Sequence, residues 1–74
     1  MKRIVIDVYD EKDGKLNGLI DIRSNEYGFS YGNDITGHGL QCKHDSESNE
    51  YRKLMFRLDR ITDLVRKIEG SEGI

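Results

Sequence analysis

Apolar and polar residues alternate in much of the first half of the chain, and this spacing of two is typical of β-strands. In segment 3–9, Ile4, Ile6 and Val8 share one face. Segment 16–23 repeats the pattern, with its isoleucines on one face. The polar stretch between the two segments contains Asp13-Gly14, which favours a hairpin turn because glycine adopts positive φ without steric cost. The two segments are therefore predicted to pair as antiparallel strands.

A third strand is predicted at 27–32, after a turn at 24–26. Its aromatic residues, Tyr27, Phe29 and Tyr31, fall on one face, and two glycines and a serine fall on the other. An exposed aromatic row could stack on bases or anchor a protein partner. We favour the alternative, an inward row, because these are the largest apolar side chains available.

A short fourth strand is predicted within residues 35–44, after Asn33 and Asp34 end the third. Apolar and polar side chains still alternate there, although two glycines weaken the pattern.

The last third of the chain carries the clearest pattern. Apolar residues recur at spacings of three and four, which predicts an amphipathic helix of about 35 Å. The stripe consists of Tyr51, Leu54, Leu58, Ile61, Val65 and Ile68, widened by Met55 and Leu64. Several N-cap side chains precede it in segment 45–50, and Gly70 suits the C-terminal end.

Together these elements predict an α+β fold: an antiparallel meander of three to four strands followed by one long C-terminal amphipathic helix packed on one sheet face. The helix stripe and the aliphatic rows of the first two strands are expected to bury a single core. Seventy-four residues allow one domain, here 1–70, with a frayed tail at 71–74. A core this small stabilises by only about 3–5 kcal/mol, so a homodimer, paired through the helix or a strand edge, is a further expectation.

Composition narrows the class of protein. The net charge is −2, with six basic and ten acidic residues in 1–50 but six basic and four acidic residues in 51–74. Nucleic-acid-binding domains are usually strongly basic, so only the C-terminal segment could lead such binding. The longest apolar run, Ile4-Val5-Ile6, is far shorter than the roughly 20 residues of a membrane span, so no membrane partner is expected. The single cysteine, Cys42, fits a reducing, cytoplasmic location.

Catalytic motifs are missing from the sequence. It contains no P-loop, HExxH or nucleophile elbow, so the protein is expected not to be an enzyme and to need no cofactor. The residues with ligand chemistry are Asp34, His38, Cys42, His44 and Asp45. They could bind zinc, but their spacing matches no usual zinc site, and packing roles are the favoured interpretation.

Phe56 lies more than about 90° from the centre of the apolar helix stripe. The candidate partner-binding residues are Phe56 and its basic neighbours Arg52, Lys53, Arg57, Arg60 and Lys67. A phenylalanine ringed by charge resembles a binding anchor with a polar rim. The alternatives are a helix flank covered by a loop, chance exposure, or a solvated basic face neutralised by Asp59 and Asp63.

A secondary acidic surface is expected from Asp7 and Asp21, which could face each other across a hairpin, together with Asp34. Such a surface suits a basic partner, for example the nucleic-acid-binding groove of another protein.

These observations predict a small non-catalytic protein-binding module, an inhibitor or adaptor that binds a larger protein stoichiometrically. In size, acidity and lack of catalytic residues, the chain resembles small inhibitors made by phages and other mobile elements, including anti-CRISPR proteins; composition alone carries this resemblance.

Two alternatives remain open. The order of elements resembles DNA-binding domains that lay a sheet in the major groove, such as the plant AP2 type and integrase arm-binding domains, and the resemblance implies arginines that project from the sheet. The predicted strands offer Arg3 and Arg23, beside Asp7 and Asp21. The other alternative is a structural homo-oligomer.

Overall fold

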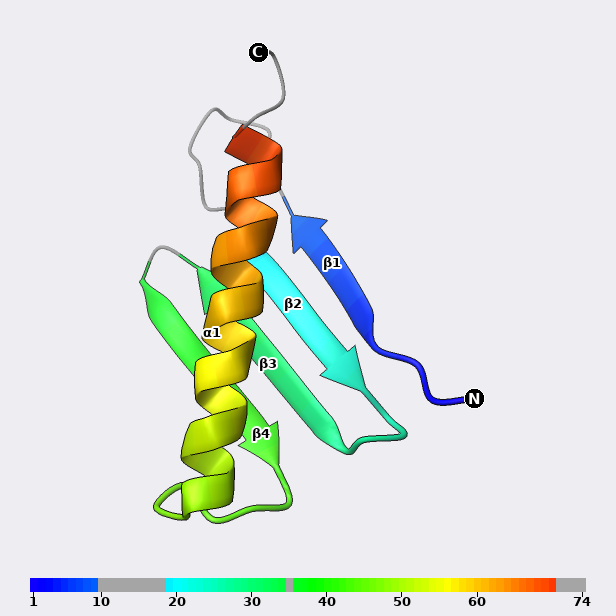
Figure 1. Ribbon diagram of the computed structural model, residues 1–74, viewed down its shortest axis with the longest axis vertical. Coiled ribbons are helices and arrows are strands. Elements are labelled where there is room, and N and C mark those ends of the chain that lie inside the picture. Colours follow the sequence, from blue (N-terminus) through cyan, green and yellow to red (C-terminus); the bar gives the residue numbers. More distant parts are fainter. Residues whose placement is uncertain (10–18, 35, 71–74) are drawn as a thin grey trace.

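The computed structural model describes residues 1–9, 19–34 and 36–70, which form one antiparallel sheet and one helix (Figure 1). The elements are β1 (Val5–Tyr9), β2 (Leu19–Ser24), β3 (Phe29–Asp34), β4 (Gly37–Cys42) and α1 (Asn49–Gly70). The strands lie in the order β1-β2-β3-β4, so each strand pairs with its neighbour in sequence. The predicted α+β meander with a C-terminal helix is confirmed. The predicted turn at 10–15, the start of the predicted second strand at 16–18 and the predicted tail at 71–74 lie outside the described residues.

The register of the strands defines the two faces of the sheet. Ile22 pairs with Ile6 of β1 and with Tyr31 of β3, and Tyr31 pairs with Leu40 of β4. Since directly paired residues point to the same side, these four residues share the face that α1 covers. The opposite face carries Asp7, Asp21, Gly32 and Gly39, which form the neighbouring row of pairs. We call this second face the open face.

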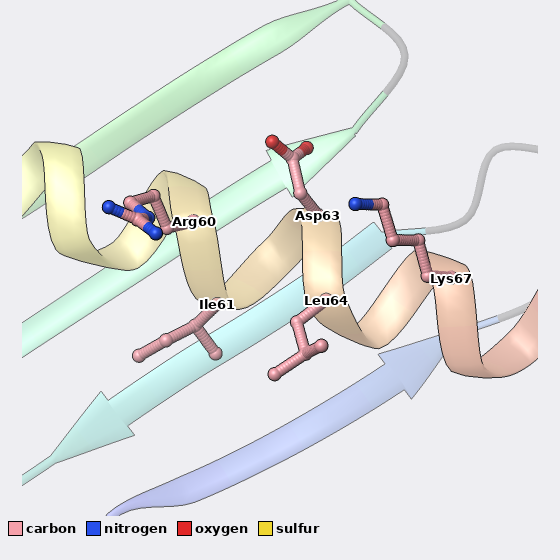
Figure 2. Close-up of a pocket in the computed structure, with 5 residues that line it drawn as sticks. All are labelled: Arg60, Ile61, Asp63, Leu64 and Lys67. Atoms are coloured by element: carbon pink, nitrogen blue, oxygen red, sulfur yellow. The ribbon is translucent and has the colours of Figure 1, made fainter.

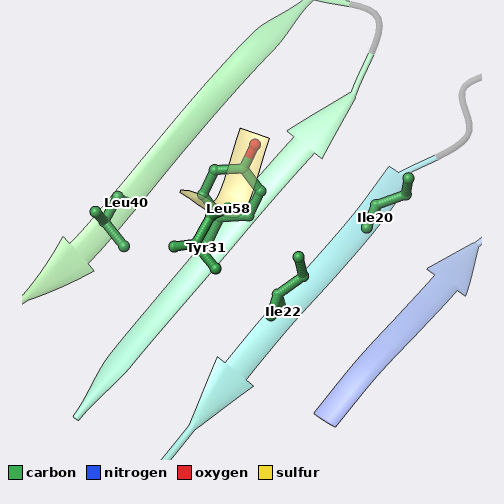
Figure 3. Close-up of a cluster of buried hydrophobic side chains, with 5 residues drawn as sticks. All are labelled: Ile20, Ile22, Tyr31, Leu40 and Leu58. Atoms are coloured by element: carbon green, nitrogen blue, oxygen red, sulfur yellow. The ribbon is translucent and has the colours of Figure 1, made fainter. Parts of the chain in front are cut away.

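The core lies between α1 and the middle of the sheet (Figure 3). Its buried residues are Ile20 and Ile22 of β2, Tyr31 of β3, Leu40 of β4 and Leu58 of α1. The side chains partly buried around it are Phe29, Cys42, Tyr51, Leu54, Met55, Ile61 and Val65. The predicted helix stripe therefore supplies much of the apolar contact.

One predicted part of the core is not buried. Ile4, Ile6 and Val8 are 51%, 44% and 37% exposed, so the prediction that this row lies in the core is wrong. The reason is the position of α1, which contacts β3 and leaves β1 to its side at the edge of the sheet (Figure 1). Leu64, which extends toward β1, is likewise 59% exposed, and Ile68, also part of the predicted stripe, is 60% exposed.

The third strand begins and ends later than predicted. Tyr27 lies in the turn before it and is half exposed, whereas Phe29 and Tyr31 point inward as expected. Gly28 has φ of 73°, and its N–H donates to the carbonyl of Ser24 at 2.9 Å. Asn33 and Asp34 continue β3 instead of ending it.

The helix begins where its capping residues predict. Ser48 precedes the first helical residue, and its Oγ accepts the N–H of Tyr51 at 3.2 Å. This is the N-cap hydrogen bond that satisfies one of the free N–H groups of the first turn. Glu50 adds a negative charge in that turn, where the helix dipole favours it.

Candidate protein-binding surface

Phe56 is the most exposed aromatic side chain of the described residues, at 61%. It lies in the middle of α1, on the side turned away from the sheet, as its position on the helical wheel predicts. The guanidinium of Arg60 lies 5.7 Å from the centroid of the Phe56 ring, within the range of a cation–π contact. The ring is therefore held beside a positive charge and open to a partner.

The predicted basic residues are all exposed: Arg52, Lys53, Arg57, Arg60 and Lys67. Lys53, Arg57 and Arg60 line the surface beside Phe56, whereas Lys67 lies about three turns farther along the helix and is not brought next to the ring. Within residues 1–9, 19–34 and 36–70, none of the five forms an ion pair. Asp59 is unavailable to them because it accepts hydrogen bonds from Tyr31 and pairs with His38. Asp63 lines a hollow together with Arg60 and Lys67 but forms no ion pair with them among the described residues. The five basic residues outnumber this one acid, so the face keeps a net positive charge.

A surface hollow of about 660 Å³ lies beside the ring, lined by Lys53, Phe56, Arg57, Arg60 and Ile61. We call this hollow and its lining residues the Phe56 face. Aromatic or aliphatic floors with charged rims are typical of the centres of protein–protein interfaces.

The same stretch of helix borders a second hollow of about 350 Å³, shown in Figure 2. In that view Ile61 and Leu64 extend toward β2 and β1, whereas Arg60, Asp63 and Lys67 lie on the other side of the helix. Ile61 therefore lies at the boundary between the basic side of α1 and an apolar side.

The apolar side continues toward β1 in a third hollow, of about 300 Å³. It is lined by Ile4, Tyr27, Phe29, Leu54, Arg57, Leu58 and Ile61. Ile6 and Val8 are exposed on the same face of β1 as Ile4, and Leu64 is exposed on the side of α1 turned toward β1, although none of the three lines the hollow itself. We call the whole the β1 groove. Alternation predicted that these strand residues share a face, but nothing in the sequence indicated that the helix would leave them uncovered.

The secondary acidic surface is partly neutralised. Asp7 and Asp21 pair across β1 and β2, as proposed from the sequence, but one arginine lies between them. Nη1 of Arg23 lies 2.6 Å from Asp7 and 2.7 Å from Asp21. The hydrogen bond to Asp7 raises the pKa of the Arg23 guanidinium, which as an arginine is charged in any case. Two negative charges are thus offset by one positive charge.

Asp34, the third residue of that surface, stabilises a turn. Its Oδ1 accepts the hydroxyl of Thr36 at 2.5 Å and the backbone N–H of Thr36 at 2.8 Å. These hydrogen bonds from Thr36 lower the pKa of the Asp34 carboxyl group. Asp34 therefore orders the link between β3 and β4.

The residues considered for zinc are dispersed in structural roles. His38 pairs with Asp59, its Nδ1 lying 2.6 Å from Oδ1, and the thiol of Cys42 lies 3.9 Å from the carbonyl of His44. In the part of the chain that the structure describes, no three His, Cys, Asp or Glu residues are grouped so that they could hold a metal ion.

A polar network between sheet and helix was not anticipated. The hydroxyl of Tyr31 donates to Oδ1 of Asp59 at 2.5 Å and accepts Nδ2 of Asn33 at 2.7 Å. Asn33 in turn accepts Nη2 of Arg66 at 3.0 Å. Sequence spacing could not show this network, because it depends on which turn of α1 lies over β3.

Comparisons with protein-family models, with curated proteins and with solved structures give no match. The functional argument therefore depends on the surfaces themselves. Among the described residues, no helix is both long and apolar enough to cross a membrane.

Proposed function

We propose that this protein is a non-catalytic binding module, an inhibitor or adaptor that forms a stoichiometric complex with a larger protein through the Phe56 face. The observation that carries the proposal is the 61% exposure of Phe56 beside three basic side chains, Lys53, Arg57 and Arg60, that have no described ion-pair partner. Aromatic and arginine side chains dominate the energetics of protein interfaces, and this face supplies both.

Binding of DNA by the sheet receives little support. Arg23 is the arginine on the open face of the described strands, and it is held between Asp7 and Asp21. A base-reading arginine must be free to form two hydrogen bonds with guanine. On the helix, an aliphatic floor next to the basic residues suits a protein surface better than it suits phosphates alone.

The proposal predicts that a larger protein is captured from host lysate by the tagged chain and that the purified pair binds with 1:1 stoichiometry. Phe56→Ala should weaken the complex at least about tenfold, because an anchor residue is removed. Arg60→Glu should weaken it as well. The measurement is isothermal titration calorimetry on the purified pair.

Two matched variants serve as controls. Tyr9→Ala removes a half-exposed aromatic side chain from the open face, and Lys43→Glu makes the same charge change as Arg60→Glu at an exposed position outside α1. Both should bind like the wild type. If the wild-type chain captures no protein, or if Phe56→Ala binds as tightly as Tyr9→Ala, the proposed docking face is wrong.

A further inference from the structure

The β1 groove is a second surface that the fold leaves open. Ile4, Ile6 and Val8 point to the side of the sheet on which α1 lies, yet each remains 37% to 51% exposed. On the helix, Ile61 lines the hollow and Leu64 is 59% exposed. Contiguous apolar surface of this kind is characteristic of interaction sites in soluble proteins.

The spacing of the elements fits one additional helix. The helix α1 contacts β3, and β1 lies two strands away in the sheet. Two strand spacings are about 10 Å, and packed helices lie about 8–10 Å apart. A helix placed over β1 would therefore contact the sheet below it and the Ile61–Leu64 side of α1 beside it. Because α1 crosses the strands obliquely, this space is widest near the starts of β1 and β3, where the hollow lined by Ile4 and Phe29 lies, and there the sheet is wide enough for a second helix (Figure 1).

Cations outnumber anions around the β1 groove. Arg57 lines the groove itself, whereas Arg60 and Lys67 lie on the other side of the helix, beside Asp63. At the other wall, the Nζ of Lys2 lies 4.8 Å from the ring centroid of Tyr27, which also lines the groove, and the carboxylate of Glu26 accepts the backbone N–H of Arg3. An occupant with acidic flanks would place carboxylates near these cations, whereas a basic occupant would be repelled.

These charges disfavour two other occupants. A second copy that inserted its own α1 would bring its Arg57 toward Arg57 and Lys2 of the first copy. A nucleic acid would satisfy the cations but would leave the aliphatic floor of Ile4, Ile6 and Val8 without an apolar partner.

We propose that the β1 groove binds an acidic amphipathic helix of the partner protein, with apolar residues at the i, i+3/i+4 and i+7 positions against the floor and carboxylates toward the basic walls. This inference rests on the proposed function, which it deepens. The Phe56 face and the β1 groove share Arg57 and Ile61, so one partner can cover both.

The experiment is a selection from a displayed library of helical peptides. Leucine or isoleucine is fixed at the i, i+3, i+4 and i+7 positions, and the flanking positions vary freely among Glu, Lys, Gln and Ser. The full chain is the target, and the support without protein is the counter-selection target. The inference predicts that peptides with glutamate flanks are enriched and that the best of them binds the wild type with 1:1 stoichiometry in fluorescence anisotropy.

Three variants test the site with the selected peptide. Leu64→Glu should weaken its binding about tenfold or more, because it removes apolar contact and adds a like charge. Ile6→Thr keeps a β-branched residue in the strand and should also weaken binding. Gln41→Glu adds the same charge as Leu64→Glu at an exposed position on the open face and should bind like the wild type. Thermal melting by circular dichroism verifies that each variant is folded.

The outcomes separate this inference from the proposed function. Enrichment of lysine flanks, absence of enrichment, or equal binding by Leu64→Glu and Gln41→Glu would overturn the groove assignment. So would a concentration-dependent dimer in sedimentation that Leu64→Glu dissociates. If one of these outcomes is observed but Phe56→Ala still abolishes capture of the partner protein, the proposed function stands without the groove. If acidic peptides bind but Phe56→Ala leaves capture unchanged, the groove stands and the Phe56 face falls.

Discussion

Tyr31 links the sheet to the helix with both parts of its side chain. Its ring is 1% exposed and belongs to the core, while its hydroxyl contacts Asp59 of α1 and Asn33 of β3. The hydroxyl of Thr62, a buried residue of α1, lies 3.4 Å from the same oxygen. A phenylalanine at this position would fill the core equally well but could not order these polar groups.

Tyr31→Phe should lower the free energy of unfolding by about 1–2 kcal/mol, because partly buried groups lose a hydrogen-bond partner while apolar packing is kept. Urea unfolding followed by circular dichroism measures the change. The matched control is Tyr27→Phe, since Tyr27 is half exposed, and its effect should stay below about 0.5 kcal/mol. Equal losses in the two variants would show that the hydroxyl of Tyr31 is not a structural link.

Comparison of the wild type with Tyr31→Phe also tests how the free energy of unfolding depends on pH. Burial, and then the hydrogen bond to Asp59, raise the pKa of Tyr31 above its ordinary value. The folded state therefore holds this proton more tightly than the unfolded state does. The resulting stabilisation is complete below the pKa of an unfolded tyrosine, about 10, and is lost as the pH rises through the higher folded value. Above about pH 10, the wild type should lose stability more steeply than Tyr31→Phe.

At the scale of elements, the sequence predicted what local patterns determine. The three-and-four spacing from Tyr51 onward and the capping by Ser48 are properties of one segment, and α1 begins where they indicate. Alternation likewise assigned the faces of β1 and β2. The predicted boundaries of the third strand were wrong. Tyr27 continues the aromatic alternation in the sequence, but the turn at Gly28 places it outside β3.

The turn between β2 and β3 should depend on Gly28. Its φ of 73° lies in the left-handed region, where a Cβ is strained even though no atom lies within 4 Å of the position it would occupy. Gly28→Ala should therefore lower the free energy of unfolding by about 1–2 kcal/mol. Gly39→Ala is the matched control: space is also open there, and φ lies outside that region, so stability should change by less than about 1 kcal/mol. Urea unfolding measures both. A similar effect at the two glycines would contradict the conformational explanation.

The candidate binding surface could be predicted only where it depends on a single element. Exposure of Phe56 follows from its angle on a single helix, and the structure agrees. The pairing of Asp59 with His38 and the open state of the β1 groove depend on how α1 crosses the sheet. No residue spacing encodes that crossing, because a helix that lay over β1 and β2 would satisfy the same apolar pattern.

At the scale of the whole molecule, one helix covers part of a four-stranded sheet. Among the described residues, burial of the strands is concentrated in β2, β3 and β4, and much of the exposed apolar surface of the sheet lies on β1 at its edge. The basic side of the helix borders this surface, while the open face is almost balanced in charge around Arg23. The asymmetry gives the protein one side suited to an apolar and acidic partner.

Ile6 and Ile22 test whether β1 is uncovered in the isolated protein, because the two residues are directly paired and point to the same face. Ile22 is fully buried, so Ile22→Thr should lower the free energy of unfolding by about 2–4 kcal/mol, through lost apolar contact and a buried hydroxyl. Ile6 is 44% exposed, and Ile6→Thr should cost less than about 1 kcal/mol in the isolated protein. Urea unfolding at two protein concentrations measures both changes.

A large loss for Ile6→Thr that grows with concentration would mean that another copy already covers β1, because only a dimer makes stability depend on concentration. A large loss independent of concentration would place β1 inside the core of the monomer, and the surface left for a partner would then be the Phe56 face alone.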